Sequence, residues 1–230
     1  MPPVPNPTAG FPTPWPATAR YDLDHAPDGL GFVQDLLNTV GAGVPRQPDL
    51  LEDLTSATRW AHDAAARWSA VTGRPVDEIV LDLDGLRELR TFRDQLGQEI
   101  DARIHAGSDP GRPGAGTADR IPTAPRTTGA TLRLDEHGSV RLEPAGTGAD
   151  LLISVALAAL FEAQLGDVRR RLKTCRNPRC RVAFYDRSRN NSGVWHSVRV
   201  CGYPTNLRAH RARRRQGFGD DDRLGPADVR

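Results

Sequence analysis

All three cysteines of this 230-residue chain lie in one short stretch near its C-terminus. Four residues separate Cys175 from Cys180, and fifteen residues further on His196 and Cys201 form a second pair with the same separation. Thiolate and imidazole ligands in two close pairs are typical of tetrahedral Zn²⁺, and four protein ligands leave no open position for catalysis. The spacing therefore predicts one structural zinc ion held by Cys175, Cys180, His196 and Cys201.

Other uses of these residues compete with the zinc site. Cysteines can fill an apolar core or form a disulfide, but this stretch is polar and rich in arginine, and the cysteine count is odd. His210 is a rival to His196 as the fourth ligand, although the resulting spacings fit less well. A module of about 40 residues cannot build an apolar core unaided. We therefore expect it to unfold without metal while the upstream domain stays folded.

Charge is distributed unevenly, although the net charge is only +2. Residues 169–215 hold fifteen basic residues and one acidic residue, whereas the remainder holds 16 basic and 28 acidic residues. A basic region of this kind suits a polyanion, and the alternatives are a solvated charge run or arginines paired with the acidic part of the chain. The candidate nucleic-acid contacts are Arg187, Arg189, Asn206, Arg208, Arg211, Arg213, Arg214 and Arg215.

Apolar spacing predicts a mainly α (α+β) fold. Residues 1–20 are rich in proline and predict a disordered arm. Helical periodicity over residues 21–168 predicts a helical domain with helices at 28–40, from 55 or 56 to 72, at 84–104 and at 150–164. A long loop over 106–129 and a β-hairpin near 131–143, turning at Gly138, complete this domain.

The cysteine-rich region predicts a small treble-clef-like finger over residues 169–217. Residues 181–188 have the alternation of a short strand followed by a turn. A basic helix is expected to begin at Pro204 or Thr205 and to end at Gly217. Residues 218–230 are acidic and predict a disordered tail.

Polar residues in the helical part offer a candidate pocket for a small-molecule effector: Asp35, Asn38, Thr39 and Trp60. The alternative is a buried, hydrogen-bonded group that fixes helix packing. No nucleophile elbow, phosphate-binding loop or metalloprotease motif occurs, so we expect no enzyme. The longest apolar run, 151–161, is too short to span a bilayer, and no export signal is visible. We therefore expect a cytoplasmic protein with no membrane partner.

The finger segment resembles the CGNR zinc finger, through the Cys175/Cys180 pair, the run Phe184 to Asn190, Trp195 and Cys201-Gly202 before an arginine-rich helix. The upstream part resembles the ABATE domain. Gln34 to Thr39 nearly matches its L-D-x-x-N-T motif, and the stretch Glu143 to Asp150 precedes its core helix. The resemblance covers about residues 28–215.

This resemblance implies a bacterial transcription regulator with a ligand- or stress-sensing N-terminal domain and a zinc finger that binds double-stranded DNA. The alternative is a zinc-stabilised module for protein interaction or RNA binding. Two departures from the family pattern stand out. His196 occupies a position that is usually Cys, and Tyr203-Pro204 replaces the Asn-Arg of the family name. The first keeps a zinc ligand, and the second removes whatever contact that arginine makes.

Overall fold

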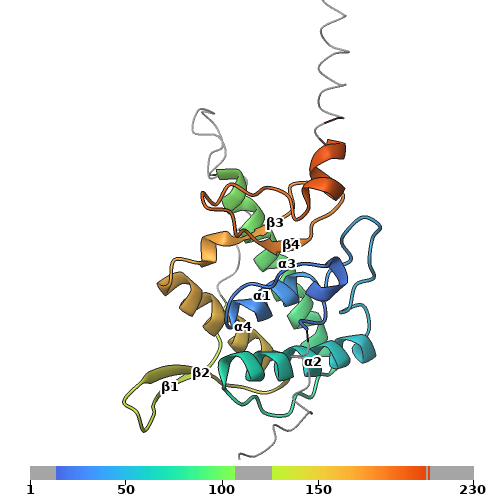
Figure 1. Cartoon of the computed structure of the whole chain (residues 1–230). Helices are drawn as coiled ribbons and strands as arrows, with labels where there is room; N and C mark the ends of the chain where they lie inside the picture. The colour runs from blue at the N-terminus through green and yellow to red at the C-terminus, as the bar shows by residue number, and fades with distance from the viewer. Residues whose placement is uncertain (1–13, 107–125, 206, 208–230) are drawn as a thin grey trace, which may run out of the picture.

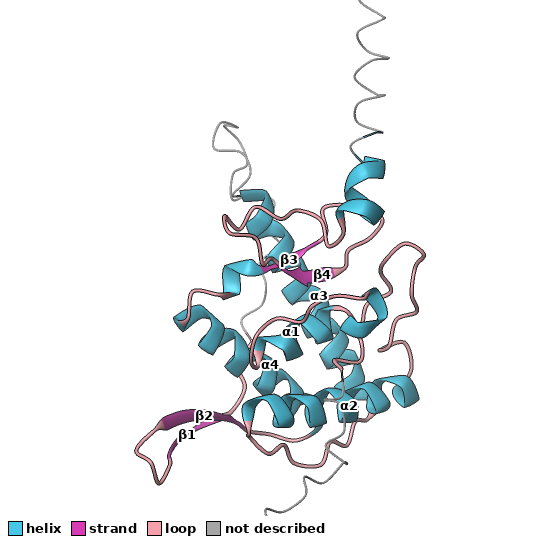
Figure 2. Ribbon diagram, viewed as in Figure 1, coloured by secondary structure: helices cyan, strands magenta, loops and turns pink. Residues whose placement is uncertain are grey.

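The computed structural model describes residues 14–106, 126–205 and 207 and shows a mainly helical body with two small β-hairpins (Figures 1 and 2). This confirms the mainly α fold class. In chain order the elements are η1 (Thr18–Tyr21), α1 (Leu30–Leu37), α2 (Leu54–Thr72), α3 (Leu83–Ala106), β1 (Ala130–Leu134), β2 (Val140–Pro144), α4 (Gly148–Leu165), η3 (Arg169–Arg171), β3 (Leu172–Thr174), β4 (Ala183–Tyr185) and the π-helical turn η4 (Val198–Gly202).

Capping side chains start two helices slightly earlier than the apolar pattern predicts. At the start of α2 the Asp53 carboxylate accepts a hydrogen bond from the Ser56 amide at 2.9 Å, so that Asp53, rather than Thr55 or Ser56, is the cap. At the start of α3 the Asp82 carboxylate accepts one from the Gly85 amide at 2.7 Å. Aspartate in this position satisfies an amide that has no partner within the helix.

Helix α4 lies at the centre of the core, where it packs against α1 and α3. Its 18 residues are long and apolar enough, by length and composition, to cross a bilayer. The apolar run at 151–161 therefore underestimated the length of this segment. Most of this helix is buried inside the protein, as in the core helix of a soluble protein. The β1–β2 hairpin that precedes it is antiparallel, pairs Leu132 with Leu142, and turns at Gly138 with φ of +77°.

The N-terminal segment corrects one prediction. Residues 14–20 were expected to belong to a disordered arm, but Trp15 is buried with a 2% exposed fraction and packs edge-on against Phe32. The Asp35 carboxylate accepts a hydrogen bond from the Thr18 amide at 2.7 Å and fixes the start of η1. The proline content predicted an extended chain, but it gave no sign that Trp15 would be buried. Residues 1–13 of the predicted arm lie outside the described part of the chain.

The second hairpin, β3–β4, lies against the helical body. The two strands are antiparallel, with Thr174 opposite Ala183, and β3 contacts α3 while β4 contacts α1 (Figure 1). Leu172 and Ala183 are buried in the same core as the helices. The sequence predicted β4 but not β3, which begins directly after the η3 turn. The finger is therefore seated on the helical domain rather than tethered to it.

Candidate metal centre

The first ligand pair lies on the turn that joins β3 to β4. The Cys175 amide donates to the Val182 carbonyl at 2.8 Å, and the Cys180 amide donates to the Asn177 carbonyl at 2.8 Å. Arg181 follows in the left-handed region, with φ of +61°. These local bonds curl residues 175–182 into a knuckle and bury both sulfurs. The C-x4-C spacing thus leaves room for a turn that is closed by its own backbone.

The second pair lies where the chain turns into the C-terminal helix. Ser197 begins the η4 turn, since its hydroxyl accepts a hydrogen bond from the Val200 amide at 3.2 Å and its carbonyl accepts from the Cys201 amide at 2.9 Å. A Cβ on Gly202 would lie 3.0 Å from Cδ1 of the Trp195 ring. Glycine is therefore favoured after the last cysteine, because a side chain there would press against the flat and rigid indole.

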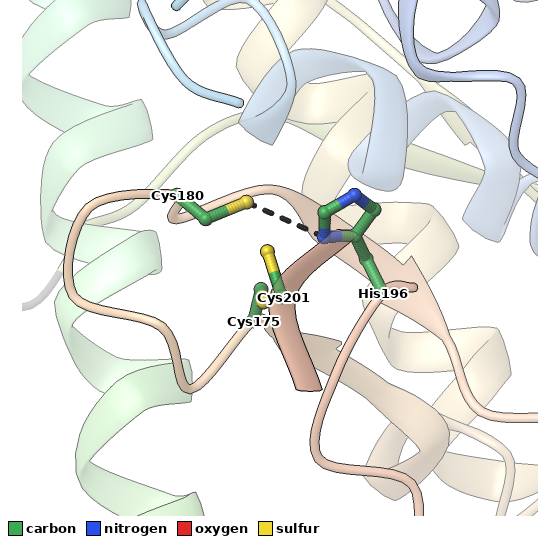
Figure 3. A group of neighbouring side chains, drawn as sticks. All are labelled: Cys175, Cys180, His196 and Cys201. Atoms are coloured by element: carbon green, nitrogen blue, oxygen red, sulfur yellow. Dashed lines mark hydrogen bonds between the residues drawn. The ribbon is translucent and has the colours of Figure 1, made fainter. Parts of the chain in front are cut away.

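The four predicted ligands come together in the structure. The sulfur atoms of Cys175, Cys180 and Cys201 and a ring nitrogen of His196 lie within 4.8 Å of one another (Figure 3). His196 turns Nδ1 towards Cys180, at 3.3 Å from its Sγ. Zinc binds sulfur at about 2.3 Å and nitrogen at about 2.0–2.1 Å, so tetrahedral ligands lie roughly 3.5–4 Å apart. The donor set therefore fits one zinc ion with little rearrangement.

The three sulfurs are close enough to influence one another's ionisation. A hydrogen bond from Cys180 lowers the pKa of Cys175 to about 4. The pKa of Cys180 is raised because it is the donor in that bond and is buried, and burial raises the pKa of Cys201 as well. Three buried sulfurs at this distance cannot all be thiolates unless a positive charge lies between them. The Asn177 amide donates to the Cys201 sulfur at 3.3 Å, as the neighbours of metal-bound thiolates commonly do.

A buried ion pair holds the loop between the two ligand pairs. Lys173, the single lysine of the chain, places Nζ 2.7 Å from the Asp186 carboxylate, 2.7 Å from the Asn191 carbonyl and 3.0 Å from the Gly193 carbonyl. Burial opposes ionisation of Asp186, but hydrogen bonds from Lys173 and Ser188 lower its pKa to about 2. A Cβ on Gly193 would lie 2.8 Å from the Asp186 carboxyl carbon. This ion pair was not predicted from the sequence, where its signal was a single lysine and a single aspartate in an arginine-rich segment.

The side chain of Asn38 binds the finger to the helical domain. Its oxygen accepts a hydrogen bond from the Ala183 amide at 2.8 Å, and its nitrogen donates to the Ala183 carbonyl at 3.0 Å. Gln34 adds a longer bond to the same carbonyl at 3.4 Å. The Gly43 amide also donates to the carbonyl of the zinc ligand Cys180 at 2.9 Å. The helical domain thus holds both strand β4 and the knuckle through buried polar contacts.

The predicted pocket residues bond to other parts of the protein in the described structure. Asp35, Asn38, Thr39 and Trp60 are buried and bond to the protein itself. Asp35 accepts from the Trp60 indole at 2.8 Å, and burial raises its pKa to about 6 despite this bond. Thr39 donates to the Leu36 carbonyl at 2.6 Å and accepts from Arg93 at 3.2 Å. Their hydrogen bonds serve packing within the helical domain and docking of the finger, which favours the alternative of a buried, hydrogen-bonded group that fixes helix packing.

The predicted nucleic-acid contacts divide into three groups. Arg187 binds the helical domain, since it donates to the His25 carbonyl at 2.8 Å and lies 3.5 Å from the Asp24 carboxylate. Arg189 is exposed. The third group lies outside the described residues and comprises Asn206, Arg208, Arg211, Arg213, Arg214, Arg215 and the rival ligand His210. The expected helix has begun, because residues 203–205 and 207 are helical.

Comparison with protein families agrees with this geometry. The CGNR zinc finger model matches residues 171–214, a segment that contains all four ligands. The ABATE model, described as "Putative stress-induced transcription regulator", matches residues 31–165, more than half of the chain. The chain belongs to the ABATE family. Among curated proteins, none matches it.

Within this ABATE protein the CGNR finger carries one structural zinc ion, because its model match and the compact ligand cluster coincide. Cys201-Gly202 keeps the first half of the family's name-giving motif, and the Trp195 contact explains the glycine. Tyr203, which follows, is 67% exposed. Neither matched family is enzymatic, and together they describe a zinc-binding regulatory protein.

Proposed function

We propose that this protein is a cytoplasmic transcription regulator whose zinc finger binds double-stranded DNA and whose helical domain senses a small-molecule effector. The finger surface supports this proposal. Arg176, Arg179, Arg181, Arg189 and Arg199 are exposed around the knuckle and the η4 turn. Within the described residues, no carboxylate lies within ion-pair distance of these five guanidinium groups. This unbalanced positive surface is the observation that carries the proposal.

Zinc has an architectural role in the proposed complex. The ion would fix the knuckle and the η4 turn, which carry exposed arginines and lead into the arginine-rich segment 206–215. DNA phosphates would take most of these contacts, and side chains near the start of the helix, Asn206 and Arg208, would lie nearest the bases. Arg187 is left out, because it already binds the helical domain.

The test is DNA binding measured by fluorescence anisotropy over a salt series, with zinc-loaded and chelated protein. If six phosphates are neutralised, log K falls with log salt with a slope of about −5. Arg208→Gln combined with Arg211→Gln should weaken binding at every sequence and make the slope less negative by about 2.

The matched control removes the same charge elsewhere. Arg87 and Arg90 are exposed on α3, and their replacement by Gln should leave DNA affinity almost unchanged. Equal loss in the two double variants would mean that net charge alone is responsible. Unchanged affinity after zinc removal would contradict the role of the finger, and a preference for single-stranded RNA would favour the alternative RNA-binding function.

A further inference from the structure

A cavity of about 530 Å³ lies where the start of α1 meets the C-terminal ends of α2 and α4. This volume falls within the range of sites for small molecules, which are about 300–1,000 Å³. None of the predicted polar pocket residues and none of the four zinc ligands line it. Its position between three helix ends makes it the strongest candidate for an effector site in the described part of the chain.

One wall of the cavity is apolar and comes from all three helices and the segment after α4: Leu30, Val71, Ala159, Ala163 and Val168. The residue before α1 is Gly29, where a Cβ would lie 3.4 Å from the Ala159 Cβ and 3.2 Å from the Trp68 indole nitrogen. Glycine and two alanines therefore keep this wall open. Such a surface accepts an aliphatic or aromatic group and rejects a fully polar ligand.

The polar wall of the cavity is an ion pair. Arg74, whose side chain is 16% exposed, donates to the Glu162 carboxylate at 2.6 Å, and Glu162 is 35% exposed. Arg74 is fixed from behind, because its guanidinium lies 5.8 Å from the Trp68 ring centre and donates to the Leu142 carbonyl at 3.3 Å. Among described residues, Nε of Arg74 has no hydrogen-bond partner. A cation that is held from behind and its anionic partner thus face one cavity side by side.

An ion pair of this kind selects a ligand that carries both charges. A simple carboxylate would have to displace Glu162 from Arg74, and a simple amine would have to displace Arg74 from Glu162. A zwitterion can place its carboxylate on Arg74 and its ammonium on Glu162 without leaving either of these charges unpaired. Asp28 at the exposed rim adds a second anion for the ammonium group.

We infer that this cavity binds a free α-amino acid with an apolar side chain. The Arg74–Glu162 pair holds the two charged groups of the amino acid, and the apolar wall holds its side chain. The inference deepens the proposed function by naming the class of effector, and it rests on that function only for its regulatory consequence.

The cavity is connected to the finger by a short stretch of chain. Val168, which lines it, donates its amide to the Ala163 carbonyl at 2.9 Å and accepts from the Arg171 amide at 3.0 Å. Arg171 in turn donates to the Asp186 and Ser188 carbonyls of the finger loop at 2.9 and 2.8 Å. A ligand that shifts Val168 therefore acts on residues bonded to the loop that carries Arg189.

The first experiment is isothermal titration calorimetry of the zinc-loaded full chain, without DNA, with L-leucine and L-phenylalanine as probes. We expect saturable binding by at least one of them, and at least about tenfold weaker binding of the matching N-acetyl amino acid, which lacks the ammonium, and of the amino-acid amide, which lacks the carboxylate. Absence of binding by both amino acids up to about 10 mM, or equal binding of the amide, would overturn the inference. This measurement is independent of DNA, so its failure leaves the proposed DNA binding untouched.

Variants test the same residues. Arg74→Gln combined with Glu162→Gln keeps the cavity neutral and should abolish amino-acid binding. The control is Arg133→Gln combined with Glu143→Gln, which removes an ion pair of the β1–β2 hairpin outside the cavity and should leave binding unchanged. If the Arg74/Glu162 double variant binds as the wild type does, the assignment of the site is wrong. Should that variant fail to fold, the probe series on the wild type decides.

Discussion

Replacing Asn38 by alanine should loosen the finger from the helical domain. Asn38 satisfies both backbone groups of Ala183, with bonds of 2.8 and 3.0 Å, and both residues are fully buried. Alanine cannot replace either bond, and an unsatisfied buried group costs about 1–3 kcal/mol. Gln34 would still donate to the Ala183 carbonyl at 3.4 Å, so most of the lost stability would come from the Ala183 amide, which would have no acceptor. We expect a decrease of about 2–4 kcal/mol in the free energy of unfolding.

Urea denaturation of zinc-loaded protein, followed by far-UV circular dichroism and tryptophan fluorescence, measures this change. Asn190→Ala is the control, because Asn190 is exposed in the finger, and it should change stability by less than about 0.5 kcal/mol. Asn38→Asp keeps the acceptor for the Ala183 amide but points a carboxylate oxygen at its carbonyl, so it should also destabilise. An Asn38→Ala protein as stable as the Asn190→Ala protein would refute the reasoning.

Three further outcomes follow from the fold. Gly31→Ala should lower the free energy of unfolding by about 2–4 kcal/mol and red-shift tryptophan emission, because the new Cβ would lie 2.6 Å from the Trp15 ring. Gly97→Ala is the control and should change neither, because its Cβ would lie 3.8 Å from the nearest neighbour. The Asp35 pKa rises from 3.8 to about 6 on folding, so its stabilising contribution is present below pH 4 and lost as pH rises through 6. The stability of wild type relative to Asp35→Asn should therefore fall by roughly 3 kcal/mol between pH 4 and 7, measured by urea denaturation, and a constant difference would exclude this burial effect. Chelation of zinc should lower the melting temperature of the helical domain by several degrees, because the domain loses its contacts with β4 and the knuckle; an unshifted helical transition would support the independent unfolding expected from sequence alone.

Local signals in the sequence were sufficient for the metal ligands. Each ligand pair spans one tight turn, and a short loop joins the two pairs, so the four donors lie near each other in the sequence. Cys175 and Cys201 could therefore be assigned without knowledge of the rest of the fold. Helices and the β1–β2 hairpin followed from apolar periodicity in the same way. The starts of α2 and α3 lie slightly earlier than predicted, because capping by Asp53 and Asp82 is invisible to an apolar pattern.

Contacts between distant segments could not be predicted. The Asn38 side chain meets Ala183 across 145 residues, and polarity alone gave no means to distinguish a docking contact from a ligand pocket. Trp15 is similar, because its prolines suggest an extended chain while its burial depends on space left by Gly31. Arg187 was assigned to DNA by its charge, and only tertiary structure brings it to the His25 carbonyl.

The central claim is that one zinc ion, held by four named ligands, fixes the finger on the helical domain. Elemental analysis of purified protein, together with limited proteolysis, tests it most directly on wild type and Cys180→Ser. We predict one zinc per wild-type chain, and in the variant a loss of zinc with cleavage between residues 175 and 201. Wild-type protein without stoichiometric zinc, or a zinc-free variant that resists protease as the wild type does, would contradict the claim.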